Sequence, residues 1–126
     1  MSELKKILYV EDEEDIRIVT KVSLETVGGF SVEICSSGEE ALEKAGPFQP
    51  DLFLLDVMMP GMDGPATLKA LRTQDAFLDT PAIFMTARVQ PQEIAEYRQM
   101  GALDVIAKPF DPMALPDRIR EIWAQR

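Results

Sequence analysis

Short apolar runs alternate with longer amphipathic stretches along the whole chain. The runs have the length of strands and are mostly apolar on both sides of the pleat, as buried parallel strands must be. They cover residues 7–10, 32–35, 52–55, 82–85 and 103–107. This pattern predicts five strands of one parallel sheet.

The stretches between these runs carry apolar residues at helical spacing. The first helix is predicted to end at Gly28 and to bury one apolar face, formed by Ile16, Val19, Val22, Leu24 and Val27. Ser36 and Ser37 each precede a glutamate by three residues, which is typical of a capping box opening a second helix. Pro116 marks either an interruption or the true first turn of the last helix. The three remaining helices are predicted over residues 63–72, 92–100 and 112–125.

Strands that alternate with helices indicate an α/β fold, in which βαβ units build a doubly wound parallel sheet with helices on both faces. The composition, 46% hydrophobic and 28% charged residues, is that of an ordinary globular protein. We find no linker, internal repeat or change of composition within the 126 residues. We therefore expect one domain over residues 1–126 and no effector domain.

Composition also excludes several classes of function. The chain has no histidine and one cysteine, Cys35, so a Ser-His-Asp triad, a histidine metal site, an internal disulfide and a cysteine-rich zinc site are all ruled out. A net charge of −9 argues against direct binding of nucleic acid. The N-terminal apolar run of four residues precedes five consecutive acids, which suits neither a signal peptide nor a membrane span. We expect a soluble cytoplasmic protein.

Candidate chemistry follows the ends of the predicted strands. In a parallel sheet these ends share one edge, where ligands bind. Three carboxylates, a hydroxyl and an ammonium follow four of the five strands: Glu11, Asp12, Asp56, Thr86 and Lys108. Ser36 obeys the same rule, but an edge strand would leave it outside the cluster.

Taken singly, each of these residues has an ordinary structural explanation. An aspartate after a strand caps a turn, a threonine caps a helix and a lysine is a solvated charge. Glu13, Glu14 and Asp15 favour the dipole of a helix N-terminus. The convergence of four strand ends on complementary groups favours a functional site.

Carboxylates on adjacent strand ends lie within roughly 5–8 Å, because neighbouring strands are about 4.8 Å apart. Like charges so close raise one pKa or recruit a cation. Oxygen ligands without histidine or thiolate favour a hard ion such as Mg²⁺, which retains several waters. An ionised Asp56 is then a nucleophile, while the metal and Lys108 neutralise a phosphoryl group and Thr86 donates a hydrogen bond to it.

Four motifs in this order resemble the receiver domains of response regulators. They are Tyr-Val-Glu-Asp-Glu at 9–13, Leu-Leu-Asp-Val-Met-Met-Pro-Gly-Met-Asp-Gly at 54–64, Met-Thr-Ala-Arg at 85–88 and Lys-Pro-Phe at 108–110. The resemblance spans essentially the whole chain and implies a flavodoxin-like, CheY-like fold with strand order 2-1-3-4-5.

The resemblance implies a role for each matched residue. Asp56 is implied as the phosphoacceptor and a metal ligand, with Asp12 as a direct ligand, the Met58 carbonyl as a third and Glu11 acting through water. The implied ion is Mg²⁺, with Mn²⁺ as a substitute. Thr86, Ala87 and Lys108 are implied in phosphoryl binding and switching.

Five positions are implied to shape or tune the site. Pro109 is implied to follow a cis peptide bond, and Gly61 and Gly64 to set the geometry of the loop after the phosphoacceptor. Met58 and Arg88 occupy positions that tune the lifetime of the phosphorylated state.

Two residues depart from the family's pattern. Glu11 replaces the more usual aspartate, and its longer arm still suits an outer-sphere role. Val105 stands where many receivers carry a tyrosine or phenylalanine that moves with the threonine, so the usual coupling of hydroxyl and ring is in question. Val105 is otherwise a plain strand residue, and nothing in the sequence makes Tyr97 its substitute.

The resemblance implies a stand-alone response regulator, not an enzyme, in a two-component phosphorelay. A sensor histidine kinase or histidine phosphotransfer protein would phosphorylate Asp56. The modified chain, a monomer or a phosphorylation-dependent dimer, would then control a protein target through the face made by helix 4, strand 5 and helix 5. Neither nucleic acid nor membrane is an expected partner.

Three alternatives compete with this interpretation. A haloacid dehalogenase-type phosphatase would carry a second aspartate where Met58 stands. A flavodoxin would hold phosphate in a Ser/Thr/Gly-rich first loop, which here is the acidic segment 11–15. A degenerate receiver acting as a phosphorylation-independent interaction module is the most serious rival, and only Val105 argues for it.

Overall fold

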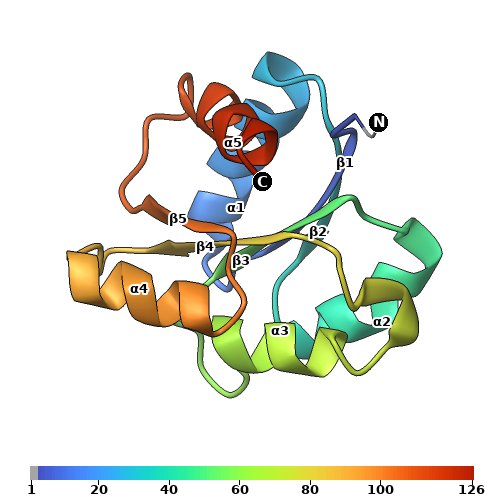
Figure 1. Ribbon diagram of the computed structural model, residues 1–126. Helices are drawn as coiled ribbons and strands as arrows, with labels where there is room; N and C mark the ends of the chain where they lie inside the picture. Colours follow the sequence, from blue (N-terminus) through green and yellow to red (C-terminus); the bar gives the residue numbers. More distant parts are fainter. Residues whose placement is uncertain (1–2) are drawn as a thin grey trace.

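The computed structural model describes residues 3–126 as one parallel sheet with helices on both faces (Figure 1). The sheet has five strands in the order β2-β1-β3-β4-β5, which confirms the predicted fold class. The strands are β1 (Lys6–Val10), β2 (Ser31–Cys35), β3 (Leu52–Asp56), β4 (Ala82–Thr86) and β5 (Asp104–Ala107). Each predicted apolar run became a strand, with ends shifted by one residue at most.

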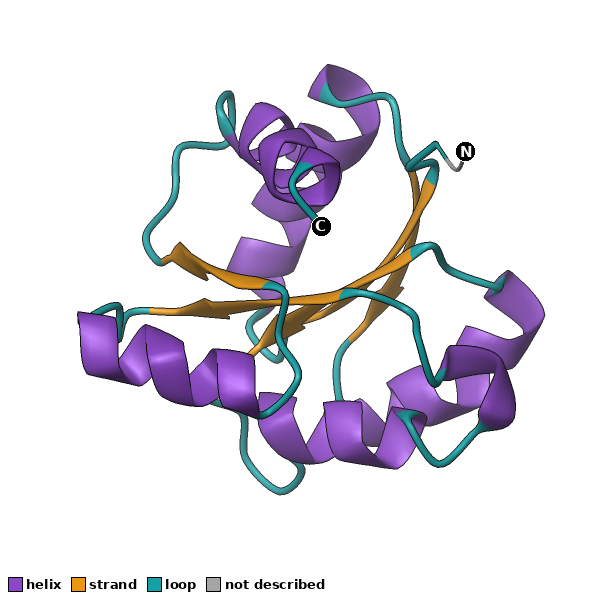
Figure 2. Cartoon of the chain, viewed as in Figure 1, coloured by secondary structure: helices purple, strands orange, loops and turns teal. Residues whose placement is uncertain are grey.

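Helices follow the strands in the predicted alternation (Figure 2). The α-helices are α1 (Glu14–Val22), α2 (Gly38–Phe48), α3 (Gly64–Leu71), α4 (Pro91–Gln99) and α5 (Leu115–Ala124). A π-helical turn, η1 (Ser23–Val27), extends α1, and a 3₁₀ turn, η2 (Asp75–Phe77), precedes β4. Within residues 3–126, none of these helices has the length and apolar character needed to cross a membrane.

The two faces of the sheet bury separate halves of the core. Helices α1 and α5 cover one face, and α2, α3 and α4 cover the other (Figure 1). Because both faces are covered, every residue of β3 and β4 is buried. This arrangement explains why these strands are continuously apolar and leaves only their ends for polar chemistry.

Local capping fixes where several helices begin. The Ser37 hydroxyl accepts a hydrogen bond from the Glu40 amide, and the Asp63 carboxylate accepts one from the Ala66 amide. These are the side-chain caps that satisfy the free amides of a helix N-terminus. Pro116 lies in the first turn of α5, which therefore starts three residues later than predicted.

The predicted apolar face of α1 is wrong. Leu24 is fully buried, but Val19, Val22 and Val27 are 45%, 54% and 43% exposed. The helix instead turns Thr20 and Ser23 inward, because both hydroxyls find hydrogen-bond partners there. The hydrophobic spacing was misleading for a second reason: the π turn, with its Gly28 amide bonded to the Ser23 carbonyl, interrupts the 3.6-residue period.

Candidate functional site

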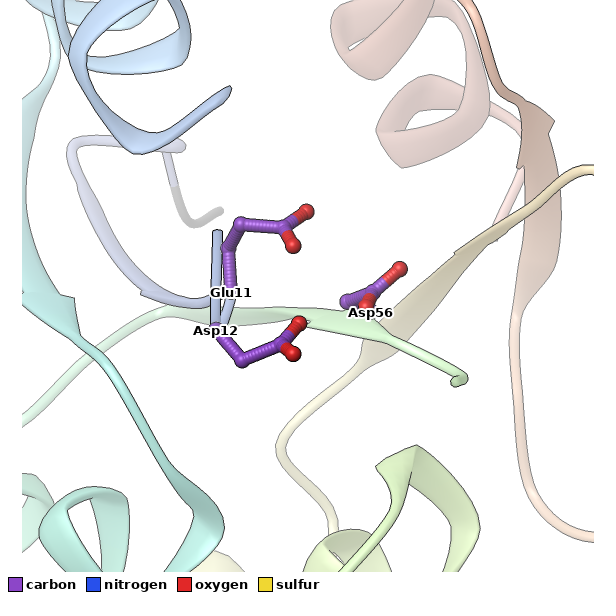
Figure 3. Close-up of side chains that lie close together, drawn as sticks. All are labelled: Glu11, Asp12 and Asp56. Atoms are coloured by element: carbon purple, nitrogen blue, oxygen red, sulfur yellow. The ribbon is translucent and has the colours of Figure 1, made fainter. Parts of the chain in front are cut away.

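The carboxyl ends of four strands bring their polar residues to one edge of the sheet. Glu11 and Asp12 follow β1, Asp56 ends β3, Thr86 ends β4 and Lys108 follows β5. Ligand atoms of the three carboxylates lie within 4.8 Å of one another, and Figure 3 shows these side chains directed into a common space. The structure thus brings together the side chains that the strand-end rule selected.

Ser36 lies outside this cluster. It follows the edge strand β2, and its hydroxyl donates to the Glu40 carboxylate at the start of α2. The edge position of β2 thus keeps Ser36 apart from the carboxylate cluster.

Lys108 joins the two buried carboxylates. Its Nζ atom lies 2.9 Å from Glu11 Oε1 and 2.9 Å from Asp56 Oδ1. Glu11 is fully buried and Asp56 is 3% exposed, so water screens neither pair strongly. The ammonium therefore neutralises part of the charge of a site in which three carboxylates face one lysine.

Burial governs the proton affinity of these groups. Loss of solvation raises the pKa of Asp56 above its ordinary value, and the hydrogen bond and charge of Lys108 only partly oppose this effect. Burial, followed by repulsion from Asp56, likewise raises the pKa of Glu11. Burial by itself lowers the pKa of Lys108, but the two carboxylates outweigh it and the pKa is raised. The site is thus short of positive charge.

A hard divalent cation fits this donor set. Carboxylate oxygens that lie within 4.8 Å of one another suit Mg²⁺, which binds few protein ligands and keeps several waters. Glu11 already accepts hydrogen bonds from Lys108 and, at Oε2, from the Glu13 amide. Asp12, the most accessible carboxylate of the three, and Asp56 are therefore better suited to direct coordination than Glu11.

A cavity of about 140 Å³ opens beside Asp56. Its lining includes Met58, Thr86, Ala87 and Lys108. Thr86 is 1% exposed, and its Oγ1 atom accepts a hydrogen bond of 3.1 Å from the Arg88 amide. Arg88 thus contacts the site through its backbone, while Met58, 63% exposed, borders the opening with its side chain.

The loops around the cavity depend on three special backbone positions. Gly61 has a φ of 74°, which glycine adopts without strain. A Cβ atom at Gly64 would lie 2.6 Å from the Asp56 carbonyl oxygen, so only glycine permits this approach of α3 to β3. The peptide bond between Lys108 and Pro109 is cis, as the resemblance implies.

Sequence reasoning missed a second row of polar groups behind the carboxylates. Tyr9 is fully buried, and its hydroxyl lies 3.4 Å from Glu11 Oε1 and 3.1 Å from Thr20 Oγ1. Burial, the largest effect, raises the pKa of Tyr9, which keeps the hydroxyl protonated. Strand periodicity offered a signal, since Tyr9 stands two residues before Glu11 and so shares its side of the sheet.

Arg17 is another functional neighbour that the sequence did not indicate. Its guanidinium donates a hydrogen bond of 2.9 Å from Nη1 to the Glu11 carbonyl. This contact ties the first turns of α1 to the acidic loop that follows β1. It places a cation beside the backbone of the site without occupying the cavity.

Val105 lies in the apolar core beneath α4. It is 6% exposed and pairs across the strands with Phe84. The Phe84 ring packs edge-on against Tyr97 of α4, with ring centroids 5.6 Å apart. The aromatic pair near this part of the sheet is therefore formed by Phe84 of β4 and Tyr97 of α4, while position 105 contributes a small strand side chain.

Comparison with known proteins gives one family. The profile of the response regulator receiver domain matches residues 7–120. The alkaline phosphatase synthesis transcriptional regulatory protein PhoP of Bacillus subtilis is 40% identical over 118 residues, which cover 94% of this chain and 48% of PhoP. The transcriptional regulatory protein CseB of Streptomyces coelicolor is 35% identical over 97% of this chain and 50% of CseB. The chain thus spans about half the length of the curated relatives it matches here.

The fold of this chain matches solved structures of similar proteins along nearly their whole length. The chemotaxis protein CheY4 of Vibrio cholerae superposes with a TM-score of 0.87 at 32% identity, covering 95% of this chain and 99% of CheY4. The receiver domain of the Francisella response regulator 1452 gives a TM-score of 0.83 at 29% identity, covering 96% of this chain and 98% of the receiver.

Proposed function

This chain belongs to the response regulator receiver domains of two-component signalling, and we propose that its Asp56 accepts a phosphoryl group in a Mg²⁺-dependent reaction. The observation that carries the proposal is the position of Asp56. Its carboxylate is paired with Lys108, lies with two further carboxylates in a cluster whose ligand atoms are within 4.8 Å of one another, and borders a cavity. Receiver domains are signalling modules, so the reaction modifies the chain itself.

The donor is a phosphohistidine of a sensor histidine kinase or of a histidine phosphotransfer protein. A carboxylate oxygen of ionised Asp56 attacks phosphorus, a phosphorus–oxygen bond forms, and the phosphorus–nitrogen bond to the donor imidazole breaks. The imidazole nitrogen then takes a proton from water. Asp56 needs no general base, because it reacts in its ionised form.

The residues around the cavity stabilise the transferred group. Lys108 already lies at hydrogen-bond distance from Asp56 and turns its ammonium to the phosphoryl oxygens. Thr86 and Ala87 line the same cavity, where the threonine hydroxyl donates a hydrogen bond to the phosphoryl group. Movement of Thr86 towards the phosphoryl group is the switching event.

Asp12, Asp56 and the Met58 carbonyl would hold the metal ion directly, with Glu11 acting through water. Bound Mg²⁺, or Mn²⁺ in its place, supplies the positive charge that this carboxylate-rich site needs for an anionic phosphoryl group. Met58, which lines the cavity, and Arg88, whose amide bonds to Thr86, set how readily water reaches the acyl phosphate and so how long it lasts.

Phosphorylation shifts the equilibrium between two conformations of the switch loop and α4, which a downstream protein reads on the α4–β5–α5 face. Ion pairs already connect the three elements of this face. Asp104 of β5 accepts from Arg98 of α4 at 3.0 Å and lies 3.5 Å from Arg118 of α5. The chain acts in the cytoplasm, either as a monomer or as a dimer formed on phosphorylation.

Asp56→Asn tests the proposal. The unaltered protein is expected to take label from acetyl phosphate when Mg²⁺ is present and to lose it when EDTA removes the metal, whereas Asp56→Asn takes none. Asp75→Asn, which changes an exposed carboxylate of η2, is the control and is expected to label normally. Equal labelling of Asp56→Asn would contradict the assignment.

The absence of labelling in the unaltered protein would favour the alternative, a degenerate receiver that acts as a phosphorylation-independent interaction module. Val105 is the observation behind that alternative, because no aromatic side chain at this position couples to Thr86.

A further inference from the structure

Behind the carboxylates lie two buried hydroxyl groups, those of Tyr9 and Thr20, that the proposed reaction does not use. Tyr9 and Thr20 are both fully buried. The Tyr9 hydroxyl lies 3.1 Å from Thr20 Oγ1 and 3.4 Å from Glu11 Oε1, and Thr20 Oγ1 lies 2.7 Å from the Ile16 carbonyl oxygen. These contacts form a chain of hydrogen bonds that connects the backbone of α1 to an oxygen atom of Glu11 in the carboxylate cluster.

These three contacts share two hydroxyl hydrogens, one from Tyr9 and one from Thr20. In one arrangement, Thr20 donates to the Ile16 carbonyl and Tyr9 donates to Thr20. In the other, Thr20 donates to Tyr9 and Tyr9 donates to Glu11. Neither arrangement leaves a buried hydroxyl hydrogen unpaired, so the Tyr9 hydrogen can turn to Glu11 at little cost.

Glu11 benefits from such a donor because its cationic partner is shared. Its Oε1 atom accepts from Lys108 at 2.9 Å, the same ammonium that pairs with Asp56. The shared ammonium compensates the fully buried Glu11 carboxylate only in part, and an incompletely compensated buried carboxylate is costly. A hydrogen bond from Tyr9 supplies part of the remaining compensation.

The unusual length of Glu11 is what makes this contact available. An aspartate at the same position would withdraw its carboxylate by one carbon–carbon bond, about 1.5 Å, beyond the reach of the Tyr9 hydroxyl. The glutamate of the acidic loop and the tyrosine of β1 therefore form a matched pair.

We propose that Tyr9 is a positioning residue of the site, whose hydroxyl, supported by Thr20, holds the Glu11 carboxylate in place for binding of a divalent cation. The inference rests on the proposed metal site. Among the described residues, the Tyr9 hydroxyl forms hydrogen bonds with Glu11 and Thr20 and not with Asp56, so its hydrogen bonding reaches the site through Glu11.

Calorimetric titration with MgCl₂ tests the inference on Tyr9→Phe, which keeps the ring and removes the hydroxyl. We expect Mg²⁺ affinity to fall about tenfold, the lower end of what loss of a group behind a metal ligand costs. Thr20→Val should give a smaller loss in the same direction. Tyr97→Phe removes the hydroxyl of the chain's other tyrosine, on α4, and should leave the affinity unchanged.

Repeating Tyr9→Phe in a Glu11→Asp variant shows whether Tyr9 acts by positioning the Glu11 carboxylate or by supporting the fold in general. In Glu11→Asp the carboxylate no longer reaches the hydroxyl, so adding Tyr9→Phe should cost no further affinity. An equal loss in both backgrounds would overturn the inference, because Tyr9 would then act by packing. An unchanged affinity of Tyr9→Phe alone would overturn it as well.

The titration of the unaltered protein distinguishes this inference from the proposed function. Binding of Mg²⁺ by the unaltered protein together with an unchanged Tyr9→Phe overturns only the role of Tyr9. Failure of the unaltered protein to bind Mg²⁺ overturns the proposed metal site and the role of Tyr9 with it.

Discussion

The floor and the rim of the site are built in different ways. The floor, defined as Glu11, Asp56 and Lys108 with Tyr9 behind them, consists of buried and half-buried groups joined by hydrogen bonds of 2.9 to 3.4 Å. The rim, defined as Asp12, Met58, Ala87 and Arg88, reaches solvent. A change in the floor alters folding stability and chemistry together, whereas a change in the rim alters ligand binding or lifetime with little effect on folding.

Lys108→Ala should have the largest effect on stability. It leaves Glu11 and Asp56 buried side by side without their shared cation, and breaking a buried ion pair from one side costs about 3 kcal/mol. Urea unfolding at neutral pH in EDTA measures this loss. The deficit should shrink at acid pH, because protonation removes the unpaired charges. A loss below 0.5 kcal/mol, the range of a surface substitution, would show that the floor is not held by charge.

Asp56→Asn should instead increase the free energy of unfolding. Burial raises the pKa of Asp56 above its ordinary value of 3.8, so the folded protein binds the proton more tightly than the unfolded chain does. This stabilising contribution is present at low pH and is lost as the pH rises through the raised value. The asparagine variant should therefore be more stable than the unaltered protein by about 1 kcal/mol at neutral pH without metal.

The pH dependence checks this sign. Urea unfolding of both proteins over a range of pH in EDTA should show the advantage of Asp56→Asn declining as the pH approaches 4. A variant that is less stable at neutral pH would mean that the ion pair with Lys108 outweighs the cost of burial.

Asp12→Asn is the corresponding test of the rim. Because this carboxylate reaches solvent, the free energy of unfolding in EDTA should change by less than about 0.5 kcal/mol. Mg²⁺ affinity should nevertheless fall at least tenfold, since a direct ligand is lost. Calorimetric titration beside urea unfolding separates the two quantities, and a stability loss as large as that of Lys108→Ala would erase the distinction between floor and rim.

Met58→Ala should have the smallest effect on the fold. The side chain is 63% exposed, so stability should stay within about 0.5 kcal/mol of the unaltered protein. The backbone carbonyl is retained, so Mg²⁺ affinity should stay the same, while easier access of water should shorten the lifetime of the phosphorylated state. The decay of label after removal of acetyl phosphate measures that lifetime, and an unchanged decay would place its control elsewhere.

The strands of the sheet, and the residues gathered at their ends, could be predicted because they follow from local sequence. A continuous apolar run such as the one ending at Leu55 is typical of a strand that is covered on both faces. Once the strands are parallel, topology alone brings Asp56 and Lys108 together although 52 positions separate them.

The face of α1 and the role of Tyr9 could not be predicted in this way. A prediction from hydrophobic spacing assumes that hydroxyls face water. Thr20 and Ser23 turn inward instead, because their hydroxyls form hydrogen bonds with Tyr9 of β1 and with the loop before α5. These partners come from segments distant in the sequence, so the spacing within α1 does not reveal them. The packing of Tyr97 on Phe84 is of the same kind, since helix spacing does not tell which strand residue a ring of α4 contacts.

The most direct test of the central claim is to locate the phosphoryl group in the unaltered protein. After treatment with acetyl phosphate and Mg²⁺, borohydride reduction converts an aspartyl phosphate to homoserine, which peptide mass spectrometry assigns to one position. We predict homoserine at position 56 alone, and none when EDTA replaces Mg²⁺. Modification at another carboxylate with position 56 untouched would contradict the account.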